Sequence, residues 1–112
     1  MTRMWMLPPA QLCRQHLLGE HAEIHQLVGF IESDRDFSAK LNGHAKRGQI
    51  ETAAIQARHD QLAAELVARD YNHDSPLEYD DELDLGEVDI AASAFDLRVR
   101  CGDCRARMEV AA

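Results

Sequence analysis

The sequence predicts an all-α protein: a compact bundle of two long helices and one or two shorter ones, with the N-terminal tail packed across the first helix. Good helix formers such as alanine, leucine and glutamate are plentiful among the 112 residues, and aromatic residues make up only 5%. In two separate stretches the apolar residues also recur at helical spacing. A chain of this length is expected to form a single domain, residues 1–112.

The first long helix is expected to run from about Pro8 to Glu32. Proline is tolerated in the first turn of a helix, so the pair Pro8-Pro9 indicates a start. The apolar residues of this stretch share one face: Leu17, Ile24, Leu27, Val28 and Ile31. A second face carries four residues with reactive side chains: Cys13, His16, Glu20 and Glu23. The polar residues 33–36 should end the helix.

Three further segments follow. A short helical turn is expected over residues 37–41, ended by the turn signal Asn42-Gly43. The second long helix should run from Gln49 to about Asp70, with an alanine-rich apolar band suited to close packing. Residues 74–90 are expected to be an acidic loop, and residues 91–112 a final helix that carries Cys101 and Cys104.

The net charge of −8 opposes binding to nucleic acid, because contacts to phosphate need cations. The charge is unevenly spread, however. Residues 1–73 hold eight Lys/Arg and nine Asp/Glu, whereas residues 74–97 hold nine acidic residues and no basic one. The first part of the chain can therefore still present a basic face. The acidic segment is expected to be a solvated loop, and the alternative is an autoinhibitory strip that mimics DNA.

The chain contains no apolar run approaching the ~20 residues of a transmembrane helix, so no membrane partner is expected. Its three cysteines are an odd number, which rules out a complete disulfide framework and favours a reducing compartment. We therefore expect a cytoplasmic protein.

Cys101 and Cys104 have the spacing of half a zinc site. The other half would have to come from Cys13 and one of three histidines: His16, His21 or His25. No second Cys-x-x-Cys pair is present. We therefore expect the cysteines to be packing residues with no metal bound, and the zinc site remains the alternative.

The start of the chain suggests a reactive amine. Thr2 is small, which favours removal of Met1 and would leave the α-amine of Thr2 free. An α-amine has a reference pKa of about 7.7–8.0, against about 10.4 for a lysine side chain, so much more of it is neutral near pH 7.5. A neutral amine is the nucleophile that Schiff-base chemistry requires.

These opening residues resemble the pyrimidine-dimer DNA glycosylases, the DenV-type endonuclease V family. The residues that carry the similarity are Thr2, Arg3, Gln15, His16, Leu17, Glu20 and Glu23. The match returns at Gly43-His44 and continues through the helix that ends at Tyr71-Asn72. It covers residues 2–28 and 43–73, so residues 1–73 are interpreted as a glycosylase-like helical core.

The resemblance implies a DNA glycosylase with AP-lyase activity. The Thr2 amine would attack the sugar C1′ of a damaged pyrimidine, with the cyclobutane pyrimidine dimer as the default lesion, and form an imine that undergoes β-elimination. Glu23 stands where the family has the carboxylate that stabilises the cationic sugar and moves a proton. The implied partner is double-stranded DNA containing damaged pyrimidines, bound by a monomer without a cofactor.

The sequence departs from the family pattern at the DNA-binding residues. The arginines of the family's first helix are replaced by Ala22 and Gln26, and the family's aromatic, basic C-terminal tail is absent. Arg58 and Arg69 are possible replacement cations. The residues we expect to bind substrate or DNA are Arg3, His16, Glu20, Arg14, His44, Lys46 and Arg47. Two alternatives remain: a non-catalytic DNA- or protein-binding module, and a small zinc-stapled interaction protein.

Overall fold

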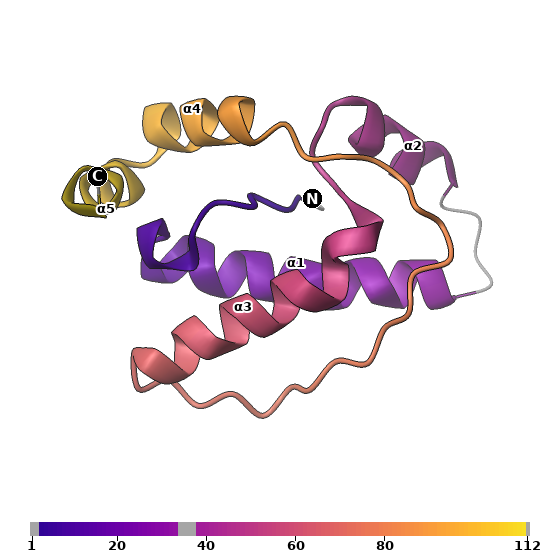
Figure 1. The fold of residues 1–112 in the computed structure, drawn as a ribbon, viewed down its shortest axis with the longest axis horizontal. Helices are drawn as coiled ribbons and strands as arrows, with labels where there is room; N and C mark the ends of the chain where they lie inside the picture. Colours follow the sequence, from indigo (N-terminus) through magenta and orange to yellow (C-terminus); the bar gives the residue numbers. More distant parts are fainter. Residues whose placement is uncertain (1–2, 34–37, 112) are drawn as a thin grey trace.

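The computed structural model describes residues 3–33 and 38–111. All the regular structure in these residues is helical, which confirms the predicted fold class (Figure 1). The two longest helices, α1 (Arg14–Glu32) and α3 (Ile55–Ala68), pack against each other. Three shorter helices complete the bundle: α2 (Ser38–Lys46), α4 (Ile90–Arg100) and α5 (Gly102–Ala111). Two 3-10 turns, η1 (Pro9–Gln11) and η2 (Thr52–Ala54), precede α1 and α3.

The core forms where the apolar face of α1 meets that of α3. Leu17, Ile24 and Leu27 of α1 are fully buried, as are Ile55 and Leu62 of α3. Burying one such side chain stabilises the fold by about 1.5–3 kcal/mol relative to leaving it exposed. The helical spacing of these residues therefore accounts for both the two helices and their contact.

Several helix boundaries differ from the prediction. The proline pair starts only the 3-10 turn, and α1 begins at Arg14 after Cys13 in an extended conformation. The expected stop at Asn42-Gly43 is wrong, because α2 continues to Lys46. Its end is set instead by Gly48, whose φ of +67° is the left-handed conformation that glycine adopts without strain. Phe37, the expected start of this turn, lies outside the described residues.

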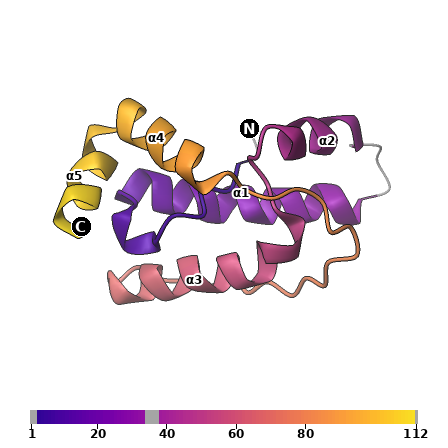
Figure 2. The same ribbon diagram turned by 45° about the horizontal axis from the view of Figure 1, so that its top comes forward.

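The predicted C-terminal helix is in fact two helices, α4 and α5. Cys101 separates them, with an extended backbone at φ −131° and ψ 107°. Gly102, which follows, is a poor helix former. Figure 2 shows the change in direction between the two helices.

The N-terminal tail lies along α1, so the prediction that it packs on the first helix is confirmed (Figures 1 and 2). Met4, Trp5 and Leu7 are buried. The Met4 N–H donates to the carbonyl of Gln49 at 2.8 Å, which links the tail to the segment after α2. The tail is thus fixed on two sides by the fold.

The acidic segment between α3 and α4 contains no helix or strand, but hydrogen bonds hold it against η2 and α3. The Thr52 N–H donates to the Leu85 carbonyl at 3.0 Å, and the Tyr79 N–H donates to Gln56 at 2.7 Å. Gly86, at φ +82°, passes so close to the Ile50 carbonyl that a Cβ would lie 2.4 Å from its oxygen.

None of the described helices has the length and apolar character needed to cross a membrane.

Candidate active site

A pocket of about 260 Å³ lies between the N-terminal tail and α1. Its lining residues come from the tail, from α1 and from the end of α4: Arg3, Trp5, Gln15, His16, Gly19, Glu20, Glu23 and Arg100. The fold therefore brings together four of the residues predicted from sequence, namely Arg3, His16, Glu20 and Glu23.

The central contact of the pocket joins the tail to Glu23. The backbone N–H of Arg3 donates to Glu23 Oε2 at 3.1 Å. Burial raises the pKa of the Glu23 carboxyl above its usual value, although the hydrogen bond from Arg3 opposes this effect. Thr2, the predicted nucleophile, lies outside the described residues and is bonded directly to Arg3 in the sequence.

The Arg3 side chain joins the tail to α4 and is only 6% exposed. Its Nη1 donates to Asp96 Oδ2 at 2.9 Å, and its guanidinium lies 4.0 Å from the ring centroid of Trp5. Arg3 Nε is buried without a hydrogen-bond partner in the described part of the chain. Trp5 is therefore both a core residue and part of the pocket wall.

Arg100 is a pocket residue that the sequence analysis missed. Its guanidinium lies 5.6 Å from the Trp5 ring centroid, on the exposed end of α4. Nothing in the local sequence places α4 beside the tail, because the Arg3–Asp96 contact spans 93 residues. Only the folded chain shows that the C-terminal region supplies a cation here.

Glu20 lies in the pocket wall but is buried and already paired. Its two carboxylate oxygens accept hydrogen bonds from Arg58 of α3, at 2.5 and 2.8 Å. Arg58 is only 2% exposed, so its prediction as a replacement DNA-binding cation is wrong. Arg69, the other possible replacement cation, is also engaged within the protein. Its guanidinium donates to the carbonyls of Pro9 and Leu12, at 3.1 and 2.7 Å.

The remaining predicted DNA-binding residues lie outside the pocket. Lys46 and Arg47 are exposed at the end of α2, and His44 is half-buried there, 3.1 Å from Gln49 Oε1. This end of α2 adjoins the N-terminal tail through the bond between Met4 and Gln49. Arg14, at the start of α1, lies with its guanidinium 5.6 Å from the ring centroid of Tyr71.

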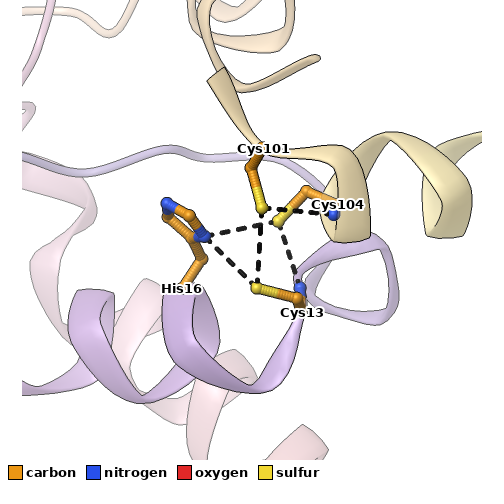
Figure 3. Close-up of side chains that lie close together, drawn as sticks. All are labelled: Cys13, His16, Cys101 and Cys104. Atoms are coloured by element: carbon orange, nitrogen blue, oxygen red, sulfur yellow. Dashed lines mark hydrogen bonds between the residues drawn. The ribbon is translucent and has the colours of Figure 1, made fainter. Parts of the chain in front are cut away.

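Next to the pocket, three thiols and one imidazole converge (Figure 3). His16 Nδ1 lies 3.2 Å from the sulfur of Cys13 and 3.5 Å from that of Cys104. The sulfurs of Cys13 and Cys101 are 3.9 Å apart. Of the three histidines considered as partners of the cysteines, the structure thus brings His16 to them.

Burial and hydrogen bonding act differently on two of these thiols. Burial raises the pKa of Cys104 to about 12. Burial also acts to raise the pKa of Cys101. Hydrogen bonds to its sulfur nevertheless hold this pKa below its usual value, and the bond from the Cys104 N–H has the largest effect among them.

The other two histidines, His21 and His25 of α1, belong to a separate cluster. They lie beside His59 of α3 and His73, which follows that helix. His21 and His25 lie with ring centroids 4.8 Å apart, and both are within 5.0 Å of His59. His21 Nε2 is also 2.9 Å from His73 Nε2. Burial, reinforced by the neighbouring histidines, lowers the pKa of His21 to about 4, so the imidazole is neutral near pH 7.

Comparison with known proteins agrees with the geometry of the pocket. No curated protein and no solved structure shows a significant match to the chain. The sequence model of one family, pyrimidine dimer DNA glycosylase, matches residues 2–79. This match covers more than half of the 112 residues and contains every residue of the pocket except Arg100. The chain belongs to the pyrimidine dimer DNA glycosylase family.

Proposed function

We propose that the chain is a DNA glycosylase with AP-lyase activity that uses the α-amine of Thr2 as its nucleophile. The substrate would be a damaged pyrimidine in double-stranded DNA, and the cyclobutane pyrimidine dimer is the first lesion to test. The observation that carries the proposal is the hydrogen bond from the Arg3 N–H to Glu23 at the pocket. It brings the residue that follows Thr2 to a half-buried carboxyl group.

The first chemical step would release the base. The lone pair of the Thr2 amine attacks C1′, and the C1′–N bond breaks with its electron pair leaving on the base, which takes up a proton. Loss of the amine proton and opening of the sugar ring then give an imine between Thr2 and C1′. The Glu23 carboxylate would stabilise the positive charge that develops on the sugar.

The second step would cut the strand. Removal of a proton from C2′ of the imine breaks the bond between C3′ and its oxygen, and the 3′ phosphate leaves. Water then hydrolyses the imine and frees the amine. Burial raises the pKa of Glu23, which would make its carboxylate a better proton acceptor for this step than an ordinary glutamate.

Substrate access would require the damaged nucleotide to leave the base stack, because C1′ is otherwise out of reach of the pocket. Arg100 at the pocket and the exposed pair Lys46 and Arg47 beside the tail supply cations for the phosphates. Glu20 and Arg58 would act as a structural pair that holds α1, α3 and the tail together. We further propose a cytoplasmic monomer that needs no cofactor for this reaction.

The proposal is tested by strand cleavage on three duplexes: ultraviolet-irradiated, abasic and undamaged. Protein with Met1 removed is compared with protein that retains Met1, after intact mass has identified each form. We expect the free-Thr2 form to cleave the irradiated and abasic duplexes and the Met1 form to cleave neither. Equal cleavage by both forms would show that Thr2 is not the nucleophile. Binding without cleavage would favour the non-catalytic DNA-binding alternative.

A further inference from the structure

We propose that Cys13, His16, Cys101 and Cys104 bind one zinc ion in a tetrahedral Cys₃His site. The site lies at the junction of three helices: Cys13 directly precedes α1, His16 lies in its first turn, and Cys101 and Cys104 flank the start of α5. The two pairs have the same spacing, Cys-x-x-His and Cys-x-x-Cys. Such spacing is typical of the ligand pairs of structural zinc sites.

Three of the distances between the ligand atoms are close to those that a tetrahedral zinc site requires. With Zn–S bonds of about 2.3 Å and a Zn–N bond of about 2.0–2.1 Å, tetrahedral geometry sets sulfur–sulfur edges of about 3.8 Å and sulfur–nitrogen edges of about 3.5 Å. The structure gives 3.9 Å between the sulfurs of Cys13 and Cys101, and 3.2 and 3.5 Å from the sulfurs of Cys13 and Cys104 to His16 Nδ1. All four ligand atoms lie within 4.8 Å of one another.

The surroundings of the sulfurs also favour a metal. The backbone N–H of Cys13 donates to the sulfur of Cys104 at 3.2 Å, and the Cys104 N–H donates to the sulfur of Cys101 at 3.4 Å. Both bonds are drawn in Figure 3. Hydrogen bonds of this kind stabilise thiolates and orient metal ligands. A disulfide does not account for the arrangement, since its sulfurs would be about 2.05 Å apart.

Such a site would serve to dock the C-terminal helices. α4 and α5 have 11 and 10 residues, fewer than the ~12–15 at which an isolated helix becomes even marginally stable in water. Phe95 and Val99 of α4 remain 67% and 65% exposed, so the helix buries only part of its apolar surface. A metal that joins Cys13 to Cys101 closes a loop of 88 residues and so restrains both helices.

The site joins the family's core to a segment outside the family match. Cys13 and His16 lie within residues 2–79, whereas Cys101 and Cys104 lie beyond them. His16 also lines the pocket, and Figure 3 shows its second ring nitrogen directed away from the thiols. Binding through Nδ1 would leave the proton on Nε2, as a fixed hydrogen-bond donor at the pocket. This last consequence rests on the proposed function, whereas the metal site does not.

The primary test is the metal content of the full chain, expressed with zinc in the medium and purified without chelator. Inductively coupled plasma mass spectrometry should find about one zinc per chain, released on titration of the thiols with a mercurial reagent. Less than about a tenth of an equivalent, or a disulfide between any two of the cysteines in protein kept under reducing conditions, would overturn the proposal. This readout is independent of glycosylase activity, so a failed metal site and a failed enzyme proposal are distinguishable.

Variants identify the ligands. Cys101→Ser, at a half-buried position, should lose the bound zinc, whereas His25→Ala in the separate histidine cluster should retain it as the matched control. The opposite pattern would place the metal in the histidine cluster and overturn the assignment.

If Cys101→Ser does not fold, Co²⁺ titrated into metal-free wild-type protein gives the answer. Intense visible d–d bands with a sulfur-to-cobalt charge-transfer band are expected for a tetrahedral thiolate site. The weak bands of octahedral Co²⁺ without charge transfer would contradict the proposal.

Discussion

Glu23 and Glu20 are both carboxylates on α1, one helical turn apart, yet their surroundings give them different roles. Glu20 is fully buried and bound by Arg58, so its charge is neutralised within the core. Glu23 is half-buried, accepts one backbone N–H from the tail and has a raised pKa. We therefore propose Glu23 as the residue that exchanges a proton at the pocket, and Glu20 as a positioning residue.

Glu23→Gln should reduce strand cleavage by about 10²–10⁴-fold, the usual contribution of a general acid–base group. Its melting temperature should stay close to that of the wild type, because glutamine can still accept the Arg3 N–H. The measurement is single-turnover cleavage of an abasic duplex. Glu32→Gln, at an exposed position at the end of the same helix, is the matched control. Equal losses in the two variants would remove Glu23 from the mechanism.

The histidine cluster should make the fold less stable in acid. The pKa of His21 is about 4 in the folded chain and about 6.5 in the unfolded chain. Between these values the unfolded state binds more protons, so the free energy of unfolding falls as the pH falls through this window. Above about pH 6.5 His21 adds no pH dependence. Urea denaturation across this range should show a smaller loss for His21→Gln than for the wild type, and an equal loss would contradict the prediction.

Sequence reasoning placed some site residues and could not place others. The sequence predicts that Glu23 and His16 share one helix face, because both lie in a single periodic stretch. It does not predict the pairing of Glu20 with Arg58 or the place of Arg100 at the pocket, because these contacts join residues far apart in the chain. For the cysteines, the repeated two-residue spacing of residues 13 and 16 and of 101 and 104 is visible in the sequence, but only the fold shows that the two pairs meet.

At the scale of helices, the periodicity of apolar residues predicts the helices that pack in the core. It does not predict the helix ends that are set by turns. α1 and α3 were predictable as helices because their apolar faces meet in the core, but α3 begins at Ile55, after the 3-10 turn η2, and not at Gln49 as expected. The end of α2 could not be predicted in this way, because Asn42-Gly43 and Arg47-Gly48 are both plausible helix ends. Of these two glycines, Gly48 is the one with a positive φ. The break between α4 and α5 falls at Cys101, where no proline marks it and where the turn brings two thiols toward Cys13.

The pair of Arg58 and Glu20 links α3 to α1, and Arg58 also donates to the Leu7 carbonyl of the tail at 2.6 Å. Arg58→Ala should therefore lower the free energy of unfolding by about 3–5 kcal/mol, because it leaves a buried carboxylate without a partner. Chemical denaturation measures the change, with the exposed Arg98→Ala as control. The double variant Glu20→Leu/Arg58→Met should recover part of the loss, and a loss below about 1 kcal/mol for Arg58→Ala would contradict this account.

At the scale of the whole molecule, the charge distribution should limit the strength of DNA binding. The acidic segment is anchored along η2 and α3, with most of its carboxylates exposed, while the exposed cations Lys46 and Arg47 lie beside the tail. With a net charge of −8, we expect the chain to make few phosphate contacts. Affinity for duplex DNA should accordingly depend only weakly on salt.

Lys46→Ala and Arg47→Ala should each make the slope of log affinity against log salt shallower by about 1, because each removes one phosphate contact. Fluorescence anisotropy with an abasic duplex measures the slope. Arg105→Ala on α5, at the other end of the molecule, should leave it unchanged (Figure 1). A change confined to Arg105→Ala would show that the DNA contacts a different face.

The most direct test of the account is to trap the imine. The protein with its free Thr2 amine is incubated with an abasic duplex and reduced with borohydride, and the adduct is digested and located by mass spectrometry. The account predicts a stable covalent adduct on the N-terminal peptide, attached at the Thr2 α-amine and absent when that amine is acetylated. An adduct on a lysine side chain, or none with protein confirmed to lack Met1, would contradict it.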